Sequence, residues 1–335
     1  MNIAIIGTSE HTGGYVRMMA FKNFLELKNN NVDIYKIPDD FFSKLWYYYQ
    51  SAYSKLKDYE IRLMNKIADA LESKLKKKNY DVVICFETKY SLILTRKMNG
   101  LKIFCCEAPV ADELYFSSKI NINRIKNVKQ IEINIMKNSD YVIFPWETTE
   151  NYVRKYVWNG DNLITIKYGC YPKNKTVKYF FPTSIVYLGS IKYYWSNKEL
   201  LSYLTKISPY KIDVYGINKP ESKYNINYKG YAQSLDILYN YQYGLNTISK
   251  DILRKKHFSS KLLCYLSYGL PVLYPEWQLF PNELKGCISY NENNFLDKIE
   301  KYSDIDEWYK ISNDAIEQGR LLDWNITLKP LEKII

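Results

Sequence analysis

The stretch that most constrains the fold is residues 257–277, HFSSKLLCYLSYGLPVLYPEW. Its pattern predicts a loop, a short helix, a glycine stop and then a buried strand. Ser259 or Ser260 should cap the helix, because a hydroxyl can accept a free amide hydrogen of the first turn. Gly269 stands where a helix commonly ends in the left-handed conformation, and residues 270–274 form the expected strand. A helix that leads at once into a buried strand is typical of an α/β fold.

The start of this helix is suited to an anion. Its first amides and the positive end of the helix dipole both favour negative charge. Lys261 adds a mobile positive charge, and Arg254, Lys255 and Lys256 approach the same place along the chain. These residues predict a phosphate or diphosphate site. The alternative is that the helix start binds only water, as most such starts do.

The rest of the sequence alternates short apolar strands with helical segments, which predicts two doubly wound α/β halves. In the first half the expected strands are residues 2–7, 32–37, 81–86, 101–106, 140–145 and 162–167. In the second half they are residues 185–188, 211–216, 226–231, 243–248, 270–274 and 287–290. Residues 170–183, which contain two prolines and several basic residues, form the expected linker.

Residues 258–273, FSSKLLCYLSYGLPVL, resemble the nucleotide-sugar motif of the GT-B fold glycosyltransferases. The resemblance is to the glycosyltransferase-4-like group and its exopolysaccharide glucuronosyltransferase relatives. The residues that match the motif are Lys261, Tyr265, Gly269, Pro271 and Val272. Cys264 departs from it, because the group usually has a glutamate there that accepts hydrogen bonds from the ribose.

The resemblance implies two Rossmann-like domains that face a cleft, the GT-B architecture. Residues 1–170 would hold the acceptor and residues 184–317 the nucleotide sugar, while a last helix, about 318–335, would cross back to the first domain. The implied activity is metal-independent transfer of a sugar from a UDP- or GDP-linked donor, without a cofactor. The acceptor would be a glycan, a lipid-linked molecule or another compound, as in polysaccharide biosynthesis.

The resemblance also implies a set of donor-binding residues in the second half. These are Gly189, Ser190, Lys192, Gly216, Tyr231, Ser259, Ser260, Lys261, Cys264 and Tyr265. Ser190 stands where the family usually has an arginine that binds diphosphate, and Lys192 would replace part of that charge. Tyr231 would stack on the nucleotide base; simple surface packing is its alternative.

The first strand leads into a loop with Gly13 and Gly14, which lacks the full glycine spacing of a dinucleotide-binding fingerprint. In GT-B enzymes a glycine loop at this place lies on the acceptor side, so this is the expected use. The alternative is a tight turn without a ligand. His11, in the same loop, is a candidate catalytic base.

Carboxylates follow two buried strands of the first half. Glu107 and Asp112 are the leading candidates for a base that would activate the acceptor in an inverting transfer, with Glu87 behind them. Ligands of open α/β sheets bind at the carboxyl ends of the strands, where these residues are expected. Each carboxylate taken singly is also compatible with an ordinary surface role. A retaining transfer would use no such base, and the sequence leaves both outcomes open.

The net charge of the 335-residue chain is +11, which favours phosphates, nucleic acid or an anionic membrane as partners. Six cysteines form no CxxC pair, so neither a disulfide framework nor a zinc site is predicted. We expect a cytoplasmic protein, because the chain begins directly with a strand. No apolar run approaches the roughly 20 residues that span a bilayer.

Residues 41–57 mix aromatic side chains with lysines. That combination suits peripheral contact with an anionic membrane surface, where aromatic rings and long basic side chains are both favourable. The alternative is a helix that packs on the core and presents its lysines to water.

Three other functions fit the same residues. A glycosyltransferase acting on nucleic-acid bases would use the net charge to bind phosphates. A nucleotide-sugar epimerase would share the fold and need no acceptor. A non-catalytic nucleotide-sugar-binding protein would account for the departures at Cys264 and Ser190.

Overall fold

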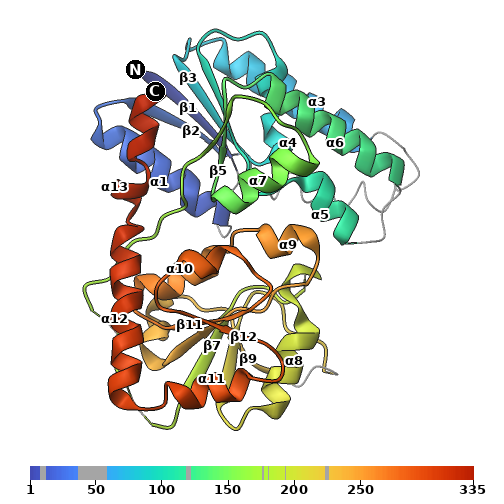
Figure 1. Cartoon of the computed structure of the whole chain (residues 1–335). Helices are drawn as coiled ribbons and strands as arrows, with labels where there is room; N and C mark the ends of the chain where they lie inside the picture. The colour runs from blue at the N-terminus through green and yellow to red at the C-terminus, as the bar shows by residue number, and fades with distance from the viewer. Residues whose placement is uncertain are drawn as a thin grey trace. The chain divides into compact units, whose positions relative to one another are not determined.

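The computed structural model describes residues 1–7, 13–36, 59–117, 122–175, 177–179, 181–192, 194–222 and 226–335. These residues form two compact units, one of Met1–Tyr168 with Leu328–Ile335 and the other of Gly169–Thr327. The candidate base His11 and the aromatic and basic segment 41–57 lie outside the described residues. Each unit is built around a six-stranded parallel sheet with helices packed on it (Figure 1).

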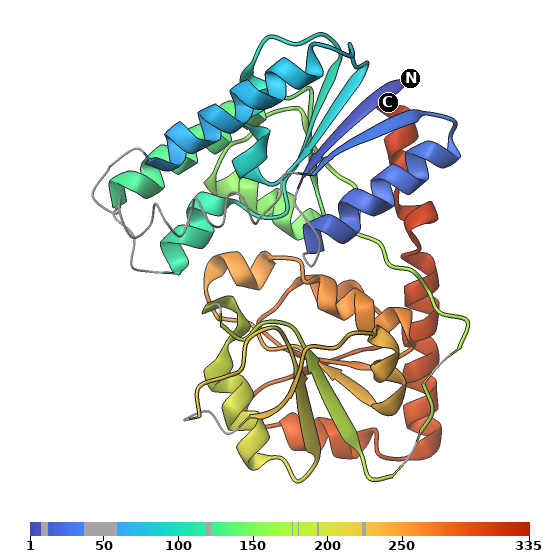
Figure 2. The ribbon, with the colours of Figure 1, turned by 180° about the vertical axis from the view of Figure 1, so that it is seen from behind.

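The sheet of the first unit has the order β2-β1-β3-β4-β5-β6. Its strands are β1 (Asn2–Gly7), β2 (Asn31–Lys36), β3 (Val82–Phe86), β4 (Leu101–Cys105), β5 (Tyr141–Phe144) and β6 (Leu163–Thr165). Its α-helices are α1 (Gly13–Leu27), α3 (Tyr59–Leu75), α4 (Thr88–Ser91), α5 (Val110–Phe116), α6 (Ile122–Lys137) and α7 (Glu147–Tyr156). Helix α1 and the pair α3 and α6 lie on opposite sides of the sheet (Figure 2).

The sheet of the second unit has the order β12-β11-β10-β7-β8-β9. Its strands are β7 (Ser184–Leu188), β8 (Lys211–Tyr215), β9 (Asn227–Gly230), β10 (Tyr243–Leu245), β11 (Val272–Pro275) and β12 (Cys287–Tyr290). Its α-helices are α8 (Lys198–Ile207), α9 (Ile252–Lys256), α10 (Ser260–Ser267), α11 (Phe295–Lys301), α12 (Ile305–Leu321) and α13 (Trp324–Thr327).

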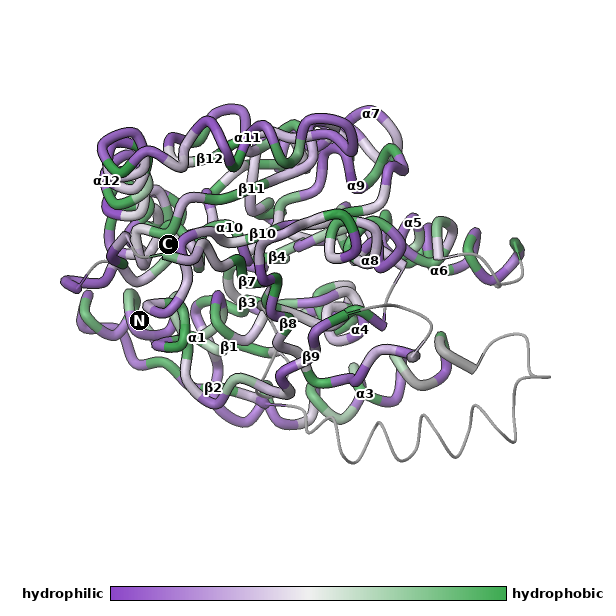
Figure 3. The backbone as a smooth tube through the Cα atoms, turned by 90° about the horizontal axis from the view of Figure 1, so that it is seen from below, coloured by the Kyte–Doolittle hydropathy of each residue, from purple (hydrophilic) through white to green (hydrophobic). Residues whose placement is uncertain are grey.

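The predicted strands are present because their sequences are continuous apolar runs, which a parallel sheet covered on both faces requires. All five residues of β3 and of β7 are buried. Strands β1, β3 and β7 are accordingly largely green in Figure 3, which colours the backbone by hydropathy. In the described part of the chain, no helix is both long and apolar enough to cross a membrane.

The strand order of each sheet reverses at one point. In the first unit β1 lies between β2 and β3, and in the second unit β7 lies between β8 and β10. Successive strands are therefore added to opposite sides of β1 and of β7. At such a reversal the loops at the carboxyl ends of the two neighbouring strands diverge, and open α/β sheets bind ligands there.

One side chain fixes α10 at the reversal point of the second unit. The ring of Tyr265 lies over Gly244 of β10, where an added Cβ atom would come within 2.3 Å of it. The Tyr265 hydroxyl accepts a hydrogen bond from the Leu188 amide (2.8 Å) and donates one to the Leu245 carbonyl (3.2 Å). Because Leu188 ends β7 and Leu245 ends β10, this buried hydroxyl joins the two strands where their own pairing has stopped.

The C-terminal part of the chain differs from the expectation of one returning helix over residues 318–335. Helix α12 belongs to the second unit, and a Cβ atom at its Gly319 would lie 2.8 Å from the Leu266 carbonyl oxygen of α10. The segment that belongs to the first unit begins at Leu328 and forms a short 3₁₀-helix, Lys329–Lys333. Pro330 has no amide hydrogen for an α-helical bond, which favours this break.

We expect Tyr265→Phe to lower the free energy of unfolding of the second unit by about 1–3 kcal/mol, because it leaves the Leu188 amide and the Leu245 carbonyl buried without their partner. Denaturant unfolding measures the change. Tyr203→Phe is the control, since Tyr203 is an exposed tyrosine of α8. Equal stability of the two variants would show that the hydroxyl bridge contributes little.

Candidate functional site

Two glycine turns meet at the carboxyl edge of the second sheet. Gly189 follows β7 with a φ of +126°, a conformation that other residues rarely adopt. Gly216 follows β8, and a Cβ atom there would lie 2.4 Å from the Gly189 carbonyl oxygen. Ser190 adds a polar link, because its hydroxyl accepts a hydrogen bond from the Asn218 side-chain amide (3.3 Å). The structure thus brings the predicted Gly189, Ser190 and Gly216 together, with no side chain between the two turns.

Lys261 extends from α10 over the same turns. Its ammonium group donates a hydrogen bond to the Tyr187 hydroxyl (3.3 Å) and lies 4.8 Å from the centre of the Tyr187 ring. A Cβ atom at Gly189 would be 3.4 Å from the Lys261 side chain. Among the residues that the structure describes, Lys261 has no acidic partner. The arrangement presents a positive charge at the point where the strand order reverses.

The start of α10 differs in one detail from the sequence prediction. Ser259 is the N-cap residue and has the expected extended backbone (φ −134°, ψ 110°), but its hydroxyl makes no capping hydrogen bond. The Leu262 amide instead donates to the Ser259 carbonyl (3.2 Å), so the first turn closes on the backbone. The Ser259 hydroxyl therefore does not occupy the amides at the positive end of the helix, beside Lys261.

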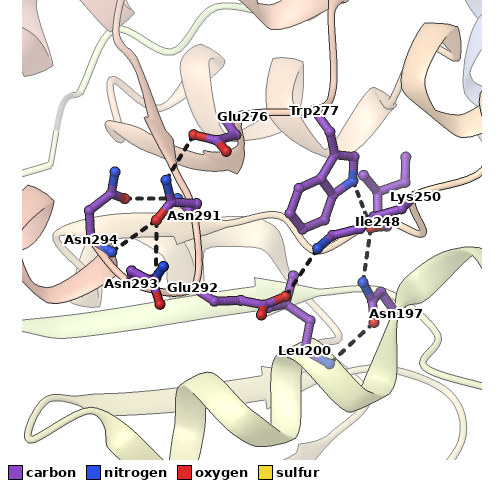
Figure 4. Close-up of polar contacts among 10 residues, drawn as sticks. All are labelled: Asn197, Leu200, Ile248, Lys250, Glu276, Trp277, Asn291, Glu292, Asn293 and Asn294. Carbon is purple, nitrogen blue, oxygen red and sulfur yellow. Dashed lines mark hydrogen bonds and ion pairs between the residues drawn. The ribbon is translucent and has the colours of Figure 1, made fainter.

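The loop after β10, which leads into α9, is held from three sides (Figure 4). The Ile248 carbonyl accepts hydrogen bonds from the Trp277 indole nitrogen (3.2 Å) and the Asn197 side-chain amide (3.1 Å). The Lys250 ammonium lies 4.5 Å from the centre of the Trp277 ring and 3.3 Å from the Glu292 carboxylate. These contacts tie the loop to the segments after β7, β11 and β12 and so fix the approach to α10.

The end of α9 adds positive charge close to α10. Arg254 is 3% exposed, and its guanidinium lies 5.0 Å from the centre of the Trp195 ring and 5.5 Å from that of Tyr194. Burial and the nearby charges of Arg254 and Lys261 hold the pKa of the His257 imidazole well below its ordinary range. His257 is therefore neutral at pH 7. It lies between α9 and α10, where the positive charges of Arg254 and Lys261 act on it.

The other four predicted donor-binding residues differ in how far they are buried. Tyr231, next to the end of β9, is 54% exposed, and Lys192 is exposed in the loop after β7. Burial raises the pKa of the Cys264 thiol to about 12, so this position offers no negative acceptor at neutral pH. Tyr265 is fully buried, and the contacts seen here place it under the site as a support for α10. Donor contact by these four residues stays a prediction.

In the first unit, Glu107 forms an ion pair with Arg17 of α1. The two side chains are 3.0 Å apart, Arg17 is fully buried, and the Glu107 side chain is 26% exposed. Arg17 also donates to the Ile166 carbonyl (3.1 Å). Burial is the largest single influence and acts to lower the pKa of the guanidinium, but the charge and hydrogen bond of Glu107, together with the nearby Cys105 and Tyr168, raise the pKa overall. The sequence prediction missed Arg17; its place among the buried residues Met18 and Phe21 of α1 was the available indication.

Asp112 lies in the first turn of α5 and is only 9% exposed. Its carboxylate accepts a hydrogen bond from the Tyr152 hydroxyl (2.9 Å) and lies 3.6 Å from the Lys129 ammonium. Glu87 follows β3 with an unusual φ of +68° and lies 3.4 Å from Lys89. The predicted carboxylates are therefore at the strand ends, as expected, and each has a basic neighbour in the same unit.

Glu132 of α6 is a fully buried carboxylate that the sequence prediction missed. It accepts hydrogen bonds from the amides of Val110 (2.7 Å) and Ala111 (2.9 Å) and from the Thr88 hydroxyl (2.9 Å). It thus joins the starts of α4 and α5. Burial raises its pKa to about 7, although these three hydrogen bonds act in the opposite direction. A glutamate in the apolar stripe with Val128 and Ile135 was the indication in the sequence.

No protein-family model and no curated protein sequence matches the chain. Solved structures do match over nearly its full length. Sucrose-phosphate synthase from Thermosynechococcus elongatus has a TM-score of 0.72 at 14% identity, covering 99% of this chain and 98% of that one. The lipopolysaccharide outer core galactosyltransferase WaaB has a TM-score of 0.69, with the same identity and coverage. HepE of Anabaena, in complex with UDP and glucose, has a TM-score of 0.65 at 12% identity, again covering 99% and 98%.

The chain has the GT-B fold. The two Rossmann-like domains that the resemblance implied are confirmed by the two six-stranded parallel sheets and by these matches. In GT-B terms, the glycine turns and Lys261 belong to the C-terminal domain, and Arg17, Glu107, Asp112 and Glu132 belong to the N-terminal domain.

The stability of the N-terminal domain should fall as the pH rises from about 4.5 to 7 through the contribution of Glu132. The folded state keeps a proton up to a pKa of about 7, whereas the unfolded chain loses it near the usual 4.5. Thermal unfolding across this pH range measures the slope. Glu132→Gln should remove this component, and Glu26→Gln, a change at a glutamate of α1 that is 41% exposed, should retain it. An unchanged slope in Glu132→Gln would contradict the assignment.

Proposed function

We propose that the protein is a glycosyltransferase that moves a sugar from a nucleoside diphosphate sugar to an acceptor hydroxyl. The observation that carries the proposal is Lys261, which lies without an acidic partner in the described chain, over Gly189 and beside the start of α10. A diphosphate would supply the missing negative charge. The fold supports this function, since the similar structures include a sucrose-phosphate synthase and a galactosyltransferase.

UDP is the nucleotide that we propose for the donor, because structures of the similar HepE contain UDP and UDP-glucose. Breaking the bond between sugar and phosphate leaves negative charge on the departing diphosphate. A lysine and a helix start that already point to this place can stabilise that charge without rearranging during the reaction. We therefore propose transfer without a metal. The acceptor class, a glycan or a lipid-linked molecule, is proposed from the sequence resemblance.

A thermal-shift screen of UDP-glucose, GDP-mannose and dTDP-glucose tests the function directly. A ligand present at 100 times its dissociation constant stabilises the folded protein by about 2.7 kcal/mol. Lys261→Ala should weaken binding of the selected donor by about 1.5–3 kcal/mol, the range for a hydrogen bond to a charged group. Calorimetry with EDTA present measures the affinity.

Lys310→Ala is the control for that variant, because Lys310 is an exposed lysine of α12. It should bind the donor as the wild-type protein does. If Lys261→Ala bound the donor with wild-type affinity, this result would contradict the proposed position of the diphosphate beside Lys261.

Glu107 is the residue that we propose as the base for the acceptor hydroxyl, with Asp112 as the second candidate. Glu107 is the more exposed of the two, and Arg17 holds one of its oxygens in place. Asp112 is nearly buried and is bound by Tyr152. The remaining candidates are Glu87, after β3, and His11, which the structure does not describe.

Glu107→Gln should lower turnover by about 10²–10⁴, the usual contribution of a general base. Asp112→Asn should have a smaller effect. Donor affinity should be unchanged in both variants, because the proposed donor residues belong to the other domain. Thermal unfolding checks that Glu107→Gln is folded, since it deprives the buried Arg17 of its ion pair. Near wild-type turnover in both variants would favour a retaining mechanism or His11.

A further inference from the structure

The backbone around His257 is held firmly between α9 and α10. The His257 carbonyl accepts a hydrogen bond from the Gln278 side-chain amide (3.4 Å), and Gln278 in turn accepts one from Asn246 (2.7 Å). Gln278 and Asn246 are both fully buried. The Leu279 amide also donates to the Lys255 carbonyl (2.8 Å). The loop after β11 therefore fixes the position of the His257 main chain.

The His257 side chain has an unusual feature in this setting. Its Nδ1 atom is buried and has no hydrogen-bond partner in the part of the chain that the structure describes. Buried polar atoms are nearly always hydrogen-bonded in folded proteins, so an unpaired one calls for a ligand or a water molecule. The residue lies two positions before Ser259, the N-cap of the helix that carries Lys261.

The charges around the imidazole are positive. Arg254 on α9 and Lys261 on α10 are the charged groups that act on it. On the other elements packed here, the rings of Tyr194 and Trp195 contact Arg254, and Gln278 in the loop after β11 is neutral. Burial is the main reason why the pKa of His257 lies below its ordinary range, and a protonated His257 would also add a third positive charge beside Arg254 and Lys261.

We propose that His257 is a further residue of the donor site, which takes up one proton when the donor diphosphate binds and then donates a hydrogen bond to it. This inference rests on the proposed function. The proton comes from solvent and returns to solvent when the nucleotide leaves, and no covalent bond forms or breaks in the step. A nearby opposite charge favours the charged form of a titratable group, so the diphosphate reverses the electrostatic bias that Arg254 and Lys261 impose.

This step couples affinity to pH. In the range between the pKa values of His257 in the free and bound protein, donor affinity should rise by up to tenfold for each unit by which the pH falls. A residue with only a packing role would change affinity or stability without taking up a proton. Proton uptake is therefore the property that distinguishes the two roles.

Calorimetric titration with UDP-glucose near pH 7, in buffers of different ionisation enthalpy, measures the protons bound. UDP-glucose is the suitable probe because its diphosphate is esterified at both ends, whereas a terminal phosphate itself titrates near pH 6, at about its second pKa. The wild-type protein should take up a substantial fraction of one proton for each donor bound, and His257→Gln should take up none. Because the chain has two histidines, His11→Gln separates their contributions: uptake should persist in this variant, and its loss would assign the proton to His11 and overturn the inference.

Nuclear magnetic resonance of the imidazole in His11→Gln gives a second measurement that leaves His257 intact. The ring signals should move from neutral to protonated values when UDP-glucose is added. Donor binding without proton uptake and without that movement overturns this inference and leaves the proposed function standing; uptake that persists in His257→Gln also overturns it. Failure of UDP-glucose, GDP-mannose and dTDP-glucose to bind overturns the proposed function and the inference together.

Discussion

The C-terminal domain depends on the hydroxyl of Tyr265. The last residues that pair between β7 and β10 are Val186 and Gly244, and the Tyr265 hydroxyl connects the two strands one or two residues further on, at Leu188 and Leu245. The aromatic ring of Tyr265 occupies the space that a side chain at position 244 would need. Lys261 lies on the same helix, so the proposed donor site shares the position that this contact gives to α10. Tyr265, a residue of the sequence motif, thus has its effect by holding α10 against the ends of β7 and β10.

The two domains handle charge in opposite ways. In the N-terminal domain three carboxylates have their partners within the domain: Glu107, after β4, is paired with Arg17, Asp112 of α5 with Lys129 and a tyrosine, and Glu132 of α6 with three hydrogen-bond donors. In the C-terminal domain the positive charges of Arg254 and Lys261 act on a neutral histidine. The first arrangement is complete in the protein alone. The arrangement in the C-terminal domain is electrostatically suited to a negatively charged ligand.

The sequence was sufficient for the strands and for the turns at Gly189 and Gly269, because each depends on a few neighbouring residues. Gly269 has the predicted left-handed φ of +74°, and β3 is the apolar run VVICF. The predicted capping bond of the Ser259 hydroxyl is not formed, because the Leu262 amide donates to the backbone carbonyl of the same residue. The end of the chain returns to the N-terminal domain from Leu328 on, but not as one helix over residues 318–335, since packing of α12 on α10 keeps the first part of that segment in the C-terminal domain.

The residues that sequence reasoning missed have partners far away in the chain. Arg17 and Glu107 are separated by 90 residues, and Thr88 and Glu132 by 44. Local periodicity shows that a charged residue lies on an apolar face, but the identity of its partner depends on how the strands are ordered. The sequence motif predicted α10 and the place of Lys261, while polar neighbours such as the Tyr187 hydroxyl are identified only by the tertiary structure.

Arg17 also restricts how the N-terminal domain could be divided. It originates in the first helix, yet its guanidinium is satisfied by Glu107, after the fourth strand, and by the Ile166 carbonyl, after the sixth. A fragment that ended before residue 166 would enclose a charged group with one of its acceptors missing, in an interior where such a loss is costly. Cutting or circularly permuting the chain between the first helix and the sixth strand should therefore be tolerated poorly wherever it separates Arg17 from Glu107 or from the Ile166 carbonyl. Arg17 thus links the first helix directly to the segments after the fourth and sixth strands.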